Sequence, residues 1–162
     1  MAYWDFTKKD KIFKERKKDL SKLINEMKCD KHVIIEIGIY KGSSARAFSI
    51  LFDKVYSIDI VPKAIDHLKE FNLKNVYPIL RDEKTIEKFN NGSIDVVYID
   101  GDHTYEGVMK DIEEYYPKIK SGGYLAGHDY GPGHNDVKKA ILKFFGREPD
   151  LLMKGTNFYY KK

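Results

Sequence analysis

Short apolar runs alternate with segments of helical periodicity along most of this 162-residue chain. The apolar runs are of strand length, and the segments between them carry apolar residues three and four positions apart. Strands that alternate with helices form a mostly parallel sheet with helices on both faces. The pattern therefore predicts a doubly wound α/β fold. The predicted strands are Val33–Ile37, Val55–Ile60, Val76–Leu80, Ile94–Ile99 and Tyr124–Gly127.

Three local signals predict where helices begin and end. Thr7 and Asp10 have the spacing of a capping box, which predicts the start of the first helix. Gly122 and Gly123 are expected to end the helix that precedes the fifth strand. Asn135 is a typical N-cap residue for the last helix.

The two edges of the sheet are also predicted. Pro78 lies in the third strand and cannot donate to a β-ladder, so this strand should lie at an edge. The segment Leu151–Tyr160, with a turn at Lys154–Asn157, predicts an antiparallel hairpin at the edge near the C-terminus. An open edge on a short chain often pairs, so a homodimer remains an open expectation.

The length favours a single domain, residues 1–162. Within it we expect an N-terminal helical segment at 1–30, a cofactor-binding core at 33–145 and terminal strands at 150–162. The formal net charge is +4. Scattered lysines on a solvated helix explain this charge better than a nucleic-acid groove does, so no nucleic-acid partner is expected.

Cysteine use and hydropathy indicate a cytoplasmic protein. Cys29 is the only cysteine, which excludes an intramolecular disulfide and fits a reducing compartment. Residues 1–10 carry charge where a signal peptide would need an apolar stretch. No apolar run approaches the roughly 20 residues that cross a bilayer, so no membrane association is expected.

Polar residues follow the carboxyl end of every predicted strand, where ligands bind in sheets of this kind. Aspartates at such places also cap the following helices. We expect capping to hold in part for Asp82 and Asp102, and much less for Asp59. The residues at these strand ends are Glu36, Gly38, Asp59, Asp82, Asp100, Asp102, His103, His128 and Asp129.

The loop Glu36–Gly42 follows a strand and opens a helix. It has two glycines, Gly38 and Gly42, where a dinucleotide fingerprint has three, and Glu36 would repel a pyrophosphate. Asp59 lies 23 residues after Glu36, which suits a carboxylate that accepts both ribose hydroxyls. The loop therefore favours a cationic adenosyl cofactor without phosphates.

These residues resemble the class I S-adenosylmethionine-dependent methyltransferases, which have a Rossmann-like fold. Glu36–Gly42 resembles their first motif, Tyr56–Asp59 their second, and Lys120–Gly123 the turn before their fifth strand. Ile99–Glu106 and Gly127–Tyr130 resemble small-molecule O-methyltransferases of the macrolide-sugar and cephalosporin-biosynthesis type. The resemblance covers roughly Val33 to Phe145.

The resemblance implies a role for each matching residue. Asp59 would bind the ribose, Ile60 would pack on the adenine, and Asp82 would receive its amino group. Asp100 would bind a divalent ion, most commonly magnesium, together with His128 and Asp129, and His103 would act as base. His128 departs from the carboxylate of the resembled enzymes, and magnesium prefers oxygen ligands. The implied cofactor-binding residues are Glu36, Gly38, Tyr40, Gly42, Ser43, Ser44, Asp59, Ile60, Asp82 and Asp100.

The expected reaction is methyl transfer from S-adenosylmethionine to a hydroxyl of a small-molecule acceptor. His103 suits a general base because its ordinary pKa lies near neutrality, and Asp100 completes the predicted catalytic pair. His103 could equally cap a helix, and His128 could be hydrogen-bonded in the sheet edge. His134 is expected at a flexible rim. Tyr130 is expected to contact the acceptor, and an aromatic lid or anchor is expected at Tyr3, Trp4 and Phe6.

Three other functions stay open. A metal-dependent hydrolase would use Asp100, His103, His128, Asp129 and His134, whose side chains suit zinc. It leaves Glu36 and Asp59 without a role. A nicotinamide-dependent oxidoreductase is disfavoured by the missing third glycine. A non-catalytic adenosyl-binding domain is consistent with the short chain.

Overall fold

Seven strands form one sheet in the order β3-β2-β1-β4-β5-β7-β6. The computed structural model describes residues 6–153 and 156–162. Strands β1 to β5 are parallel, and β7 is antiparallel to both β5 and β6. The doubly wound fold with an antiparallel C-terminal edge is thus confirmed. The strands are β1 (Val33–Ile37), β2 (Lys54–Asp59), β3 (Val76–Leu80), β4 (Ile94–Ile99), β5 (Ile119–Gly127), β6 (Leu151–Leu152) and β7 (Phe158–Lys161).

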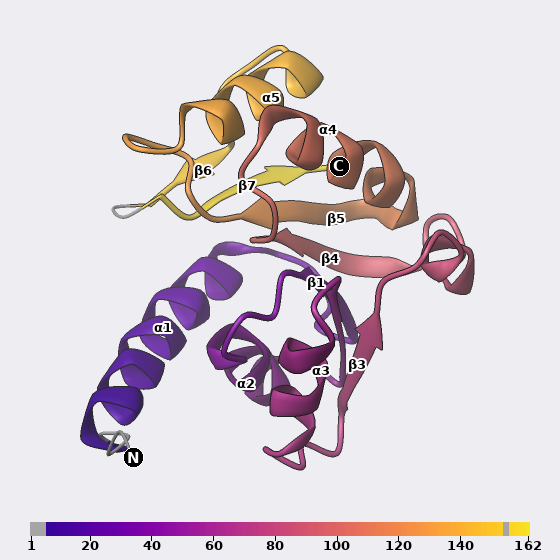
Figure 1. Ribbon diagram of the computed structural model, residues 1–162. Coiled ribbons are helices and arrows are strands. Elements are labelled where there is room, and N and C mark those ends of the chain that lie inside the picture. The colour runs from indigo at the N-terminus through magenta and orange to yellow at the C-terminus, as the bar shows by residue number, and fades with distance from the viewer. Residues whose placement is uncertain (1–5, 154–155) are drawn as a thin grey trace.

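Helices cover both faces of this sheet, as Figure 1 shows. Helices α1, α2 and α3 share one apolar core with the sheet, and α4 and α5 share a second core on the opposite face. The α-helices are α1 (Phe6–Glu26), α2 (Ser43–Leu51), α3 (Pro62–Lys69), α4 (Tyr105–Tyr115) and α5 (Asn135–Phe145). Two short 3₁₀ helices are η1 (Thr85–Lys88) and η2 (Tyr116–Lys118).

The two cores explain why the central strands are apolar without alternation. In β1, Ile34 packs into the core of α1 to α3 and Ile35 into the core of α4 and α5. Every residue of β4 is buried. A strand with helices on both faces has no solvent-facing side, so apolar side chains are favoured at successive positions.

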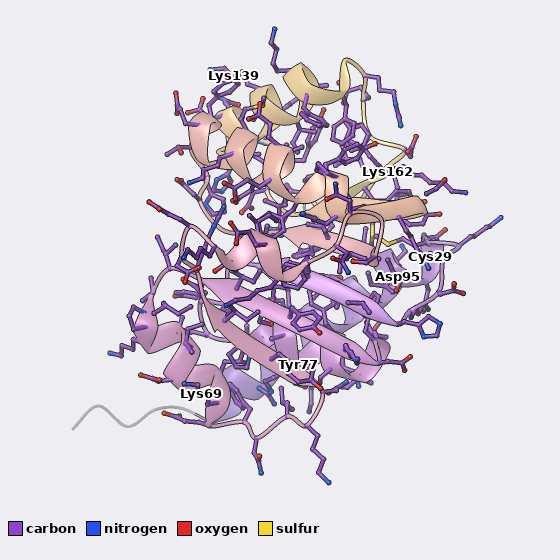
Figure 2. The ribbon with its side chains drawn as sticks, turned by 90° about the vertical axis from the view of Figure 1, so that its right-hand side faces the viewer. Cys29, Lys69, Tyr77, Asp95, Lys139 and Lys162 are labelled. Carbon is purple, nitrogen blue, oxygen red and sulfur yellow. The ribbon has the colours of Figure 1, made fainter. Side chains whose placement is uncertain are left out.

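The edge strands are those that the sequence predicts. Strand β3 lies at one edge, where Pro78 costs no hydrogen bond to a further strand. Tyr77 in the same strand is 44% exposed, and Figure 2 shows its side chain at this edge. At the other edge, β6 and β7 form the predicted hairpin.

Two predicted element ends are wrong. Gly122 and Gly123 lie inside β5 rather than at the end of a helix, because α4 ends at Tyr115 and η2 leads directly into β5. The β4–β5 register shifts in this region, and Gly122 has a φ of 79°. Asn135 is the first residue of α5, and His134 occupies the N-cap position without a side-chain capping hydrogen bond.

The first helix begins at Phe6, so Thr7 lies inside it rather than at its cap. The structure describes neither residues 1–5 nor the side chains of residues 6–10, so the predicted capping contacts of Thr7 and Asp10 and the aromatic lid of Tyr3, Trp4 and Phe6 lie outside what it describes. Of the helices described, none combines the length and the apolar character that a membrane span requires.

The strand order reverses direction at β1, whose neighbours are β2 and β4. Ligands bind outside the carboxyl ends of the strands at such a switch point. The opposite end of the sheet is tied together by structural contacts. There the buried Asp95 accepts a hydrogen bond from the Val33 amide at 2.7 Å and forms an ion pair with Lys120. Cys29 lies near Asp95 at this end, far from the switch point (Figure 2).

Candidate functional site

A cleft of about 1450 Å³ opens at the carboxyl ends of β1, β2, β3 and β4. Most of the predicted cofactor-binding residues that line this cleft lie at the end of one of these strands or directly after it. The topology therefore brings together side chains that lie far apart in the sequence. The predicted residues that line the cleft are Gly38, Tyr40, Asp59, Ile60, Asp82 and Asp100.

Gly38 allows the loop after β1 to pass close to the end of β4. Its φ of 96° favours glycine, and a Cβ at this position would overlap the carbonyl oxygen of Asp100. The Gly38 amide donates to the Ile58 carbonyl at 2.9 Å, and the Asp100 amide donates to the Ile37 carbonyl at 2.9 Å. These contacts fix the backbone of the loop at the bottom of the cleft.

Asp59 holds two backbone segments at the edge of the cleft. Its Oδ2 accepts from the Ile39 amide at 2.8 Å, and its Oδ1 accepts from the Val61 amide at 2.9 Å. A carboxylate has further lone pairs, so these bonds leave room for ribose hydroxyls. Asp59 therefore orders the loops after β1 and β2, although bonds of this local kind were expected much less at Asp59 than at Asp82 and Asp102.

Four predicted cofactor residues are not among those that line the cleft. These are Glu36, Gly42, Ser43 and Ser44. Gly42 is the N-cap of α2 and faces the side chains of α3 and the segment that follows it. Gly42 therefore shapes the start of α2.

Glu36 is fully buried beneath the loop. Its Oε2 accepts a hydrogen bond from Ser57 Oγ at 2.7 Å, whereas Oε1 has no hydrogen-bond partner among the described residues. Burial raises the pKa of Glu36 to about 7, against the opposing effect of the Ser44 and Ser57 hydroxyls. The carboxyl group therefore changes its charge near neutral pH.

The far end of the cleft contains an ion cluster that the sequence analysis missed. Arg81 follows β3 and contacts Asp111 Oδ1 at 2.5 Å and Glu114 Oε2 at 2.6 Å, both on α4. All three line the cleft. Asp82 accepts hydrogen bonds from the Lys84 amide and Thr85 Oγ1 and so orders the turn before η1, but Lys84 rather than Asp82 is the N-cap of that helix. The position of Arg81 directly after a strand could have been used to predict that it lies at the site. Nothing in the sequence marks Asp111 and Glu114 as its partners.

Two carboxylates and three imidazoles meet where β4 and β5 end. His103 Nε2 lies 3.0 Å from Asp129 Oδ2 and 3.9 Å from Asp100 Oδ1. His128 Nδ1 lies 2.8 Å from Asp129 Oδ1 and 3.8 Å from Asp100 Oδ1. The structure thus brings together the predicted catalytic and metal-binding residues. It also adds His134, whose Nε2 is 3.6 Å from Asp129 Oδ1.

Asp129 is positioned by an unusual backbone and by the C-terminal hairpin. Its φ of 63° is uncommon for a residue other than glycine. The Asp129 amide donates to Thr156 Oγ1 at 3.0 Å. The hairpin therefore aims the carboxylate toward the three histidines.

Arg16 reaches this cluster from α1, and no sequence signal indicated it. Its guanidinium forms a salt bridge with Asp100 Oδ2 and donates to Tyr98 Oη at 3.1 Å. Tyr98 is fully buried and donates in turn to Asn157 Oδ1 at 2.9 Å. This chain of contacts links α1, β4 and the segment before β7.

A second, polar hollow of about 800 Å³ lies next to the cleft. His103 and His134 line it, and their rings meet edge to face with centroids 4.8 Å apart. Gly101 and Asp102 line both the hollow and the cleft. The hollow is therefore separated from the cleft by one short loop.

Two expectations concern residues around the hollow. Tyr130 is buried, and its Oη donates to Glu148 Oε2 at 2.6 Å, so the predicted acceptor contact of Tyr130 is wrong. His134, expected at a flexible rim, lines the hollow and also takes part in the cluster around Asp129.

The carboxylates determine the electrostatics of His103. A side-chain interaction with Asp100, followed by attraction to Asp129, raises the pKa of His103 above its ordinary value although partial burial opposes this. The His103–Asp129 pair is the arrangement in which a carboxylate orients an imidazole and stabilises its protonated form.

The donor atoms do not fit magnesium, the ion that the resemblance implies. Asp100 and Asp129 supply oxygens, but the atom placed between them is the nitrogen of His128. Magnesium strongly favours oxygen ligands in octahedral geometry.

The fold and the cleft define a doubly wound domain of the kind that binds adenosyl cofactors at its switch point. A family model described as a methyltransferase domain matches residues 35–130, more than half of the chain. The chain therefore belongs to the methyltransferase domain family. The matched segment includes part of β1, all of β2 to β5, and the predicted cofactor-binding, catalytic and metal-binding residues from Glu36 to Asp129.

One curated relative is an uncharacterized protein of Acanthamoeba polyphaga mimivirus. It is 36% identical over 67 residues, which are 41% of this chain and 27% of that protein. The match thus spans about a quarter of the relative's length.

Solved structures share the fold at low sequence identity. An S-adenosylmethionine-dependent methyltransferase from Aquifex aeolicus superposes with a TM-score of 0.66 at 20% identity, over 98% of each chain. A protein from Streptococcus mutans, solved in complex with SAH, has a TM-score of 0.61 at 22% identity. That match covers 81% of this chain and 88% of the other.

Proposed function

We propose that this protein transfers a methyl group from S-adenosylmethionine to a hydroxyl of a small-molecule acceptor. The observation that carries the proposal is the wall shared by two cavities. Gly101 and Asp102 separate a cleft edged by Asp59 from a polar hollow that contains His103. A donor in the cleft and an acceptor in the hollow would meet at this wall.

The cleft suits the adenosyl donor. Asp59 lies where a carboxylate accepts ribose hydroxyls, and Ile60, which is 71% exposed, offers an apolar surface for adenine. Asp59 and Asp100 line the cleft, and carboxylates there favour a sulfonium over a pyrophosphate.

The reaction requires alignment of the two substrates and removal of one proton. Holding an acceptor oxygen next to an activated methyl group supplies much of the rate enhancement. His103 would take the hydroxyl proton on Nδ1, because its Nε2 faces Asp129, as the oxygen attacks the methyl carbon and the bond to sulfur breaks. Asp129 would orient His103 and stabilise the imidazolium that forms.

Labelled methyl transfer tests this function. The protein is incubated with S-adenosylmethionine labelled in its methyl group and a panel of small hydroxylated compounds. We expect label in at least one acceptor. His103→Ala should lower kcat by about a hundredfold or more, the typical contribution of a general base. Its affinity for S-adenosylhomocysteine should stay within about twofold, because His103 lies in the hollow.

His32→Ala is the matched control, because His32 is an exposed histidine paired with Asp53 at the other end of the sheet. It should retain full turnover. Full turnover by His103→Ala would show that His103 is not the base. Hydrolysis of the test compounds without methylation would favour the hydrolase instead.

A further inference from the structure

Three possible metal-donor atoms lie close together where β4 and β5 end. The nitrogen of the proposed base, His103, is not one of them. Asp100, His128 and Asp129 each offer one donor atom, and these three atoms all lie within 4.8 Å of one another. His128 Nδ1 is 3.8 Å from Asp100 Oδ1 and 2.8 Å from Asp129 Oδ1. Two donors that bind one ion at about 2.1 Å each lie about 3 to 4 Å apart. These separations are close to what a single ion requires.

Each carboxylate divides its two oxygens between different partners. Asp100 Oδ2 is paired with Arg16, which leaves Oδ1 facing His128. Asp129 Oδ2 contacts His103, whereas Oδ1 faces His128 at 2.8 Å and, farther away, His134 at 3.6 Å. Both Oδ1 atoms are therefore directed to the same place, while the base keeps a carboxylate oxygen of its own.

A second donor group, His103, Asp129 and His134, shares Asp129 with the first. The side chains of His103 and His134 are 43% and 37% exposed, whereas those of Asp100, His128 and Asp129 are 18%, 25% and 14% exposed. The less exposed group excludes more water from an ion. It also leaves His103 free to accept a proton.

We propose that Asp100, His128 and Asp129 bind one divalent first-row transition-metal ion, and that the ion is not magnesium. One imidazole nitrogen with two carboxylate oxygens suits the borderline ions from manganese to zinc. The use of the ion in catalysis rests on the proposed function, whereas its binding to these three residues does not. When bound, the ion would lower the pKa of an acceptor hydroxyl at an open coordination position.

Metal titration of the tag-free, chelator-treated protein tests the inference without cofactor or turnover. The probes are Co²⁺, followed by its visible absorption and by calorimetry, and Zn²⁺ and Mg²⁺, followed by calorimetry. We expect one equivalent of Co²⁺ or Zn²⁺ to bind, and about a tenfold excess of Mg²⁺ not to displace it.

Two histidine variants locate the ion. His128→Ala should weaken Co²⁺ binding at least about tenfold. His134→Ala, the matched variant, should bind Co²⁺ within about threefold of wild type. Circular dichroism checks that both variants are folded. The reverse order of effects would place the ion on the His103–Asp129–His134 group and overturn the proposal.

A substitution of the nitrogen donor tests the choice of ion. His128→Asp makes the donor set all oxygen, so its affinity for Mg²⁺ should rise relative to Co²⁺. Wild-type protein that binds no Co²⁺ or Zn²⁺, or that binds Mg²⁺ as well as either, contradicts the proposal. None of these readouts involves S-adenosylmethionine. The metal site can therefore be upheld when the proposed methyl transfer is contradicted, and the metal site can be contradicted when methyl transfer is upheld.

Discussion

At the scale of single residues, Glu36 shows how position and role can be separable. Its place at the end of β1 was predictable, because Glu36 lies two residues before Gly38, the first glycine of the loop. That its side chain does not line the cleft was not predictable, because the sequence does not show which way the side chain packs. The structure places Glu36 under the loop, with one unpaired carboxylate oxygen and a pKa of about 7.

We expect Glu36 to make stability depend on pH. The native state retains a proton on Glu36 up to about pH 7, whereas the unfolded chain releases it near the ordinary value of 4.5. The native state therefore binds more protons in this window, and the free energy of unfolding falls as pH rises from 4.5 to 7. The contribution is on the order of 3 kcal/mol at most, given about 1.4 kcal/mol per pKa unit.

Glu36→Gln, which cannot ionise, should lose this part of the pH dependence. Urea unfolding of both proteins at pH 5 and pH 8 measures it. Wild type should lose more stability than Glu36→Gln between the two values. Glu15→Gln, at an exposed position of α1, is the control and should behave as wild type. An identical loss in wild type and Glu36→Gln would show that Glu36 does not titrate in this window.

At the scale of elements, α1 is part of the site as well as of the core. The helical period of its apolar residues predicts a buried face, and Leu20, Leu23 and Ile24 are fully buried. The period does not show which strand end the helix crosses, so the contact of Arg16 with Asp100 was not predictable. Gly122 and Gly123 were assigned to a helix end for a similar reason. Glycines with a positive φ occur both at helix ends and at irregularities in strands, and the sequence does not distinguish the two.

Arg16 should contribute to stability through the polar groups that it satisfies. Arg16→Leu keeps the apolar stem but leaves Asp100 Oδ2 and the buried Tyr98 hydroxyl without their donor. We expect a loss of about 1–3 kcal/mol in the free energy of unfolding, the cost of unsatisfied buried polar groups. Chemical denaturation measures it.

Lys14→Leu provides the comparison for Arg16→Leu, because Lys14 is an exposed residue of the same helix. It should change the free energy of unfolding by no more than about 0.5 kcal/mol. Equal effects of the two substitutions would mean that the contacts of Arg16 with Asp100 and Tyr98 add nothing to stability.

At the scale of the whole molecule, topology determines most of what was predictable. Alternating strands and helices imply a parallel sheet, and Pro78 implies its edge, so the carboxyl ends of the strands had to meet. That is why Asp59, Asp100, His103 and Asp129 were predicted to lie together. Contacts between elements that share no motif, such as Arg81 with Asp111 on α4, depend on how side chains pack across the cleft. Single-sequence patterns carry no signal for them.

Calorimetric titration with S-adenosylhomocysteine and NAD tests the adenosyl site in the cleft most directly. Wild type should bind S-adenosylhomocysteine and not NAD. Asp59→Asn should weaken this binding about tenfold or more, because it removes a charged acceptor for the ribose hydroxyls. Asp66→Asn, at an exposed residue that lines the same cleft, should bind as wild type does. Wild-type protein that binds no S-adenosylhomocysteine, or binds NAD more tightly, would contradict the assignment of this cleft.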